Sequence, residues 1–126
     1  MGQAHILEFN KVPAADWGGG IITRKLVAAS IGATDFCNGI TTFPPGGALR
    51  MHTHNVDESV TVIEGDAIVD VGDESRPLKP YDTSFVPAGI PHRFRNAGAG
   101  TMSILWVYTG THVTRTFVET GETWEE

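Results

Sequence analysis

The chain has 126 residues, which is enough for one domain with a buried core. Its formal net charge of −6 at pH 7 argues against nucleic acid as a partner, because phosphate binding needs a basic surface. The single cysteine excludes a disulfide within the chain and suits a reducing compartment.

Residues 1–20 are expected to form an N-terminal arm. They lack the basic region and the long apolar run of a signal peptide. No apolar run in the chain approaches the roughly 20 residues that a membrane helix requires. We therefore expect a cytoplasmic protein that has neither a membrane nor a nucleic acid among its partners.

From residue 21 onward, the chain consists of short β-branched and aromatic runs separated by glycine and proline turns. Such runs at short, regular intervals are typical of a β-sandwich or a β-barrel. No segment repeats apolar residues at helical spacing over three turns. We therefore predict an all-β single domain, followed by a C-terminal extension at 111–126 with an acidic, solvated end. The predicted strands lie in the runs 21–32, 36–43, 59–65, 66–72, 83–89, 92–98 and 101–110.

A candidate metal site lies near the middle of the chain. On a strand, His52 and His54 face the same way, with their Cα atoms about 6.6 Å apart along the strand. Glu58 would be out of their reach on the same straight strand, whereas Asn55 and Asp57 are suitable turn residues. We therefore expect a turn after His54, so that Glu58 starts the returning strand and faces the histidines from that neighbouring strand.

Of the other three histidines, His92 has the most informative surroundings. It follows a turn at Pro87–Gly89 and starts the predicted strand 92–98, from which it can face the interior of a small barrel. His5 and His112 lie outside any such pattern, and we expect them at the surface.

These residues resemble the two sequence motifs of the cupin superfamily. The first motif, G-x5-H-x-H-x3,4-E-x6-G, matches residues 46–65 at Gly46, His52, His54, Glu58 and Gly65. The second motif, G-x5-P-x-G-x2-H-x3-N, covers residues 81–96 and matches at Pro87, Gly89, His92 and Asn96. Tyr81 stands where the second motif has its first glycine. The resemblance implies a double-stranded β-helix, or jelly-roll barrel, as a single cupin domain over residues 1–126.

The resemblance also implies that His52, His54, Glu58 and His92 bind one divalent transition-metal ion per chain. Nitrogen and carboxylate donors without a thiolate suit iron, manganese, nickel, cobalt, zinc or copper, and do not select among them. Four protein ligands in an octahedron leave two positions open. Histidine must be neutral to bind a metal, and its ordinary pKa is about 6.5, so we expect metal binding to weaken in mild acid.

Side-chain parity predicts what surrounds the metal. Phe94 shares the parity of His92, and Val60 shares that of Glu58, so both are expected to face inward and contact a substrate. On the 101–110 run, Trp106 belongs to a face whose direction the sequence leaves open. The plainer interpretation is that each of these apolar residues is barrel core.

Arg50 is a further candidate for substrate binding. It lies two residues before His52, so on a continuous strand it faces the same way as both histidines. There, its guanidinium could bind a carboxylate or enolate oxygen with two hydrogen bonds. The alternative is an exposed arginine on the rim of the barrel.

An apolar pocket with few polar groups favours a small aromatic or carbonyl substrate. Glu58 and Tyr108 are the candidate catalytic residues, because no second carboxylate or histidine suggests itself as a base. This absence favours dioxygenase-type chemistry. Two alternatives stay open: a lyase, isomerase or cyclase that uses the metal as a Lewis acid, and a non-catalytic domain that binds or senses a small ligand. We also expect a homodimer, because open strand edges need covering.

Overall fold

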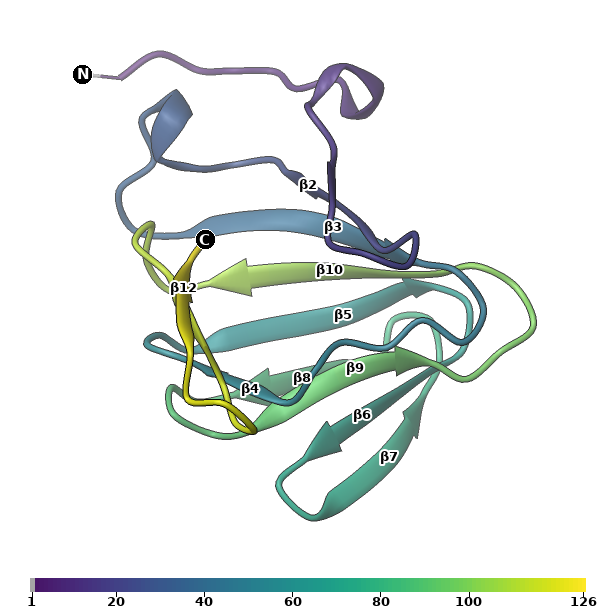
Figure 1. Cartoon of the computed structure of the whole chain (residues 1–126). Helices are drawn as coiled ribbons and strands as arrows, with labels where there is room; N and C mark the ends of the chain where they lie inside the picture. The colour runs from purple at the N-terminus through teal and green to yellow at the C-terminus, as the bar shows by residue number, and fades with distance from the viewer. Residues whose placement is uncertain (1) are drawn as a thin grey trace.

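The computed structural model describes residues 2–126, and its regular structure consists almost entirely of strands (Figure 1). Two short 3-10 turns, η1 (Phe9–Lys11) and η2 (Ala29–Ile31), lie near the N-terminus. The strands in chain order are β1 (Ala15–Asp16), β2 (Ile22–Lys25), β3 (Cys37–Phe43), β4 (His52–His54), β5 (Glu58–Glu64), β6 (Ala67–Val71), β7 (Glu74–Leu78), β8 (Thr83–Val86), β9 (His92–Asn96), β10 (Met102–Tyr108), β11 (Thr114–Phe117) and β12 (Thr123–Glu125).

The strands form two antiparallel sheets of six strands each. One sheet has the order β1-β2-β3-β10-β5-β8, and the other has the order β12-β11-β4-β9-β6-β7. The chain crosses repeatedly from one sheet to the other, and Figure 1 shows the two layers facing each other. This arrangement confirms the all-β jelly-roll barrel that the sequence predicts.

Apolar side chains alternate along the strands and fill the space between the two sheets. The inward face of β10 carries Met102, Ile104, Trp106 and Tyr108, all of which are buried. This answers which face of the predicted strand 101–110 points inward. Each fully buried large apolar side chain stabilises a fold by about 1.5–3 kcal/mol, so this face contributes strongly to the core.

Apart from β4, which the spacing of the two histidines predicts, four strands lie outside the predicted runs: β1, β7, β11 and β12. Strand β7 is polar and exposed and contains Pro77, which weakens any prediction of a strand. Strands β11 and β12 form a hairpin from residues that we expected to be an extension, and β11 pairs with β4. The predicted run 21–32 is shorter than expected, because β2 ends at Lys25 and η2 follows.

The turn between His54 and Glu58 exists, but the predicted position of Glu58 is wrong. Strand β4 pairs with β11 and β9 in one sheet, whereas β5 pairs with β10 and β8 in the other. Glu58 therefore faces the histidines from the opposite sheet and not from a neighbouring strand. The turn carries the chain across the barrel.

Among residues 2–126, none of the helical segments is long and apolar enough to cross a membrane.

Tyr81 adopts a backbone conformation that favours glycine. Its φ is +74°, which makes it the single non-glycine residue with a positive φ among residues 2–126. A side chain in this left-handed region costs about 1–2 kcal/mol through contact of Cβ with the backbone. The motif position that usually holds glycine therefore carries a local strain in this protein.

We predict that Tyr81→Gly is more stable than Tyr81→Ala by about 0.5–1 kcal/mol, because glycine removes the Cβ strain and loses part of the gain to its larger entropy in the unfolded chain. The Tyr81 side chain is 82% exposed, so both variants lose little packing. Urea unfolding of the two variants measures the difference. An alanine variant that equals or exceeds the glycine variant in stability contradicts the prediction.

Candidate metal centre

Three histidines meet inside the barrel. His52 and His92 are directly opposite each other on the paired strands β4 and β9. His54 lies two residues beyond His52 and faces the same side. One ring nitrogen from each of the three lies within 4.8 Å of the others, and all three side chains are buried. The alternation of the strand therefore brings the predicted histidines together.

Each histidine uses its Nδ1 atom for a hydrogen bond to a backbone carbonyl. His52 Nδ1 lies 2.6 Å from the Arg50 oxygen, and His92 Nδ1 lies 2.9 Å from the Ile90 oxygen. His54 Nδ1 lies 3.0 Å from the oxygen of Thr114 on β11. A carbonyl can only accept, so each neutral imidazole carries its proton on Nδ1. The Nε2 lone pairs are then free to bind a metal ion.

Glu58 approaches the histidines from across the barrel. Its Oε1 atom lies 2.9 Å from Nε2 of His92 and 3.8 Å from Nε2 of His54, and its side chain is buried. Because Nε2 of His92 carries a lone pair, it faces a carboxylate oxygen that also accepts. Two buried acceptors at this distance need a cation between them, either a proton or a metal ion.

The separation of these atoms suits a metal ion. Nitrogen and oxygen ligands about 2.1 Å from an ion lie about 3.0 Å apart when they occupy adjacent corners of an octahedron. The His92–Glu58 distance of 2.9 Å agrees with this value. The three buried histidines and this Glu58 distance are compatible with a divalent transition-metal ion. The ligand atoms that lie within 4.8 Å of one another are those of His52, His54 and His92, so Glu58 as a fourth ligand stays a prediction.

Burial keeps two of the histidines neutral. The pKa of His52 is lowered to about 2 and that of His54 to about 4, with burial as the largest cause and the positive charge of Arg115 as a further one. For His54, the carboxylate of Glu58 acts in the opposite direction. With these pKa values, neither histidine gains a proton near pH 5 while the protein is folded. Protonation of His52 or His54 should therefore weaken metal binding only at a lower pH than their ordinary pKa suggests.

The hydroxyl group of Tyr108 completes this cluster. It lies 3.2 Å from Nε2 of His54, and without a metal ion it donates to that nitrogen, because His54 holds its own proton on Nδ1; an ion bound by His54 would use this lone pair instead. Tyr108 stands opposite Glu58 on the paired strands β10 and β5. Burial and the nearby carboxylate of Glu58 raise the pKa of Tyr108 well above its ordinary value. Tyr108 therefore keeps its proton at neutral pH.

Residues 39–108 match the family described as "Cupin domain". The chain belongs to the cupin family. Protein SchB of Streptomyces halstedii is 32% identical over 97 residues, which cover 76% of this cupin and 70% of SchB. Polyketide synthase CurC of Streptomyces cyaneus is 35% identical over 81 residues, which cover 64% of this cupin and 53% of CurC. This cupin thus spans about half the length of CurC.

Solved structures share the fold of this cupin. The polyketide cyclase RemF of Streptomyces resistomycificus matches with a TM-score of 0.77 at 23% identity. The matched region covers 94% of this cupin and 89% of RemF. An RmlC-like cupin of Shewanella frigidimarina matches with a TM-score of 0.75 at 19% identity. The matched region covers 86% of this cupin and 92% of the Shewanella chain. At these identities the likeness establishes the fold alone.

Apolar side chains surround the histidines of this cupin. Val60 and Phe94 are buried on the inward faces of β5 and β9, and the ring of Phe94 lies 6.1 Å from that of His92. Trp106 packs against Tyr108 at a ring distance of 5.1 Å, and its indole N–H donates to the Thr41 hydroxyl. The structure thus places all three predicted lining residues inside the barrel, where they exclude water from the centre.

Arg50 lies on the rim of the barrel. Strand β4 begins only at His52, so the parity argument does not extend to Arg50. Its guanidinium group donates to the exposed carboxylate of Glu119 and lies 3.9 Å from the centre of the Phe117 ring. Arg50 is exposed, and its role in substrate binding stays a prediction.

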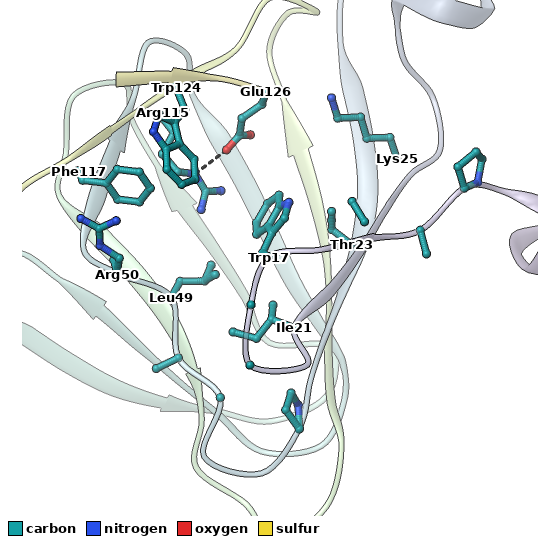
Figure 2. Close-up of a pocket in the computed structure, with 18 of the residues that line it drawn as sticks. Trp17, Ile21, Thr23, Lys25, Leu49, Arg50, Arg115, Phe117, Trp124 and Glu126 are labelled. Atoms are coloured by element: carbon teal, nitrogen blue, oxygen red, sulfur yellow. Dashed lines mark hydrogen bonds and ion pairs between the residues drawn. The ribbon is translucent and has the colours of Figure 1, made fainter. Parts of the chain in front are cut away.

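A cavity of about 1000 Å³ opens beside the metal centre, between the N-terminal arm, the 44–50 loop and the β11–β12 hairpin (Figure 2). It is lined by Arg50 and by Arg115, and not by any of the four candidate ligands. Arg115 stands opposite His54 on the paired strands β11 and β4, so it points to the same side of the sheet.

Sequence reasoning missed Arg115. The signal was present in the alternation of Val113, Arg115 and Phe117, which all point inward and are buried. An arginine between two apolar residues of one parity indicates a charge on the inner face of a strand. The prediction of an extension at 111–126 leaves no strand there, and so no inward face for Arg115.

We predict that the protein binds about one transition-metal ion per chain and that His52→Ala/His92→Ala binds none, because the variant loses two of the three imidazoles. Elemental analysis of protein purified without a chelator or a histidine tag measures this. The matched control is His112→Ala, which removes an exposed histidine and leaves the metal content unchanged. Undiminished metal in the double variant would refute this ligand set.

The metal-free protein should lose stability as the pH falls from 7 to 4.5. His52 and His54 have folded pKa values of about 2 and 4, whereas the unfolded chain binds protons with a pKa of about 6.5. In this window the unfolded state holds more protons, so each histidine contributes a loss of roughly 2–3 kcal/mol by pH 4.5. Urea unfolding at both pH values measures the change.

A His54→Gln variant serves as the comparison, because it removes one titrating group and should show a smaller dependence on pH. Equal stability of the metal-free parent at pH 7 and pH 4.5 would count against neutral, buried histidines.

Proposed function

We propose that this cupin is a metal-dependent enzyme that closes or rearranges a small aromatic or carbonyl substrate by Lewis-acid chemistry of the cyclase type. The observation that carries the proposal is the set of three imidazoles held on backbone carbonyls, with their Nε2 atoms facing Glu58. An ion bound by these residues would supply polarisation of a substrate carbonyl.

The names of similar proteins favour a cyclase. One relative carries the name polyketide synthase CurC, and RemF is called a polyketide cyclase. Ring closure within a chain of carbonyl groups needs one carbonyl carbon made electrophilic and a proton removed from a carbon next to another carbonyl. It consumes no oxidant. These requirements match a Lewis-acid centre with one carboxylate beside it.

Two residues of this cupin are assigned the two proton transfers of ring closure, one as acceptor and one as donor. Glu58 is the carboxylate in contact with His54 and His92, and we assign it the role of proton acceptor. Tyr108 holds its proton at neutral pH and is placed to donate it to a developing oxyanion. Val60, Phe94 and Trp106 exclude water, which strengthens each of these interactions.

Dioxygenase-type chemistry is the second candidate. Three nitrogen donors and one carboxylate also suit iron, manganese and copper, which react with O2. The apolar surroundings and the absence of a second carboxylate beside the histidines, within residues 2–126, fit this candidate too. A binding domain without catalysis is the third, and it lacks an observation of its own.

The expected homodimer stays a prediction. Strands β1 and β8 are the outer strands of one sheet, and β7 and β12 are those of the other. Phe85 on β8 is exposed, so a second copy would cover both an open edge and an apolar side chain.

We predict that the metal-loaded protein catalyses exchange of the α-hydrogens of 1,3-diketones with deuterium from solvent, without consuming O2. Glu58→Gln should slow this exchange by about 100-fold or more, because the proton acceptor is lost. Proton NMR follows the exchange, and an oxygen electrode follows O2. Metal content is measured in parallel, since three histidine ligands remain in this variant.

The matched control is Glu64→Gln, which changes an exposed carboxylate on the same strand. It should exchange like the parent. O2 uptake that accompanies loss of the diketone would favour the dioxygenase, and neither exchange nor O2 uptake across a panel of diketones and phenols would favour a binding domain.

A further inference from the structure

Arg115 is a buried cation at the junction of the cavity and the metal centre. Its side chain is only 7% exposed, although a guanidinium group never loses its charge at physiological pH. Strand β11 directs it into the barrel opposite His54. A buried charge of this kind is stable only with a partner of opposite sign.

Glu126 supplies that partner. Its carboxylate accepts from Nε of Arg115 and is itself only 12% exposed (Figure 2). Of the other charged groups that line the cavity, Arg50 pairs with Glu119 and Glu125 pairs with His112. Lys25 is exposed and forms no ion pair among residues 2–126. The Arg115–Glu126 pair is therefore the buried charge pair of this cavity.

Glu126 is attached to a peripheral part of the fold. It follows β12, which is a short edge strand with all three of its residues exposed. Beyond the β11–β12 pairing, the N–H of Glu126 donates to the carbonyl of Val113. Arg115, by contrast, lies on a strand that is paired on both sides. The carboxylate can therefore leave while the guanidinium group stays in place.

The walls beside this pair are aromatic and apolar. The ring of Trp17 lies 4.5 Å from Arg115 Cζ, and the rings of Phe117 and Trp124 contact each other at 4.7 Å. Ile21 and Leu49 are further apolar residues of the lining. A volume of about 1000 Å³ is at the upper end of the range for small-molecule sites, so the cavity admits a ligand with two or more fused aromatic rings.

We propose that Arg115 binds the carboxylate of an aromatic ligand, and that Glu126 occupies this position until the ligand displaces it. A guanidinium group binds a carboxylate with two parallel hydrogen bonds, and the flat walls accept the attached rings. Exchange of one carboxylate for another leaves Arg115 paired throughout. An uncharged ligand gains nothing from this exchange, so the site selects anions.

This binding site adjoins the metal centre of the proposed function and does not depend on it. Because Arg115 stands opposite His54, a carboxylate on Arg115 holds the attached rings at the entrance to the centre. The anion site can be tested in metal-free protein, so its failure is distinguishable from failure of the proposed enzyme activity.

The test compares 2-naphthoate with its uncharged amide, 2-naphthamide, by isothermal titration calorimetry on metal-free protein. Glu126→Gln should bind 2-naphthoate about 10- to 100-fold more tightly than the parent, the range for a hydrogen bond to a charged group, because the competing carboxylate is gone. Binding of 2-naphthamide should change by less than about threefold. The double variant Arg115→Gln/Glu126→Gln should lose the preference for 2-naphthoate.

The matched control is Glu74→Gln, which frees the exposed Arg76 outside the cavity lining and should leave the affinity for 2-naphthoate unchanged. If Glu126→Gln is unstable because Arg115 lacks a partner, 2-naphthoate should restore folding in a thermal melt and 2-naphthamide should not. Equal binding of the two probes by Glu126→Gln, or binding of 2-naphthoate only after zinc is added, would overturn the proposal.

Discussion

The three hydrogen bonds from histidine Nδ1 to backbone carbonyls are the constraint on which the centre depends. They place every proton on the side away from the metal position and aim every Nε2 lone pair at it. Two of the accepting oxygens, those of Arg50 and Ile90, lie two residues before their own histidine, so the local chain fixes the tautomers of His52 and His92. The third belongs to Thr114 on β11, which pairs with β4. The strand order of the barrel therefore fixes the tautomer of His54 and brings the three rings together.

The same constraint makes the centre costly without a cation. Three imidazoles and a carboxylate are buried where water does not solvate them, and Nε2 of His92 faces Glu58 as one acceptor faces another. A barrel with well-packed apolar side chains in place of these four polar residues would have a larger free energy of unfolding. That the barrel instead buries four polar ligands means that the stability of the folded state is coupled to what binds between them.

The sequence predicted which histidines lie together inside the barrel, because their geometry is largely local. Alternation on a strand fixes which side His52 and His54 face, and the glycines and prolines mark where the strands turn. The sequence could not assign Glu58 to a sheet. Side-chain alternation shows which face of a strand a residue lies on, but it does not show which other strands pair with that strand. Sequence reasoning missed β11 because Thr114–Phe117 is short and lies in a polar part of the chain. Tyr81 is the opposite case: the motif indicates glycine there, and its φ of +74° supplies the physical reason.

Arg115 links the centre to the cavity through charge. Its positive charge contributes to the lowered pKa values of both His52 and His54, so it helps to keep these ligands neutral and able to bind a metal. With a divalent ion held beside Glu58, the ion and the guanidinium group together carry more positive charge than this one carboxylate balances. Glu126 offsets one unit of this excess through its pair with Arg115. Any ligand that takes the place of Glu126 must supply the same negative charge, because otherwise the entrance to the centre would hold two uncompensated cations in a poorly solvated space.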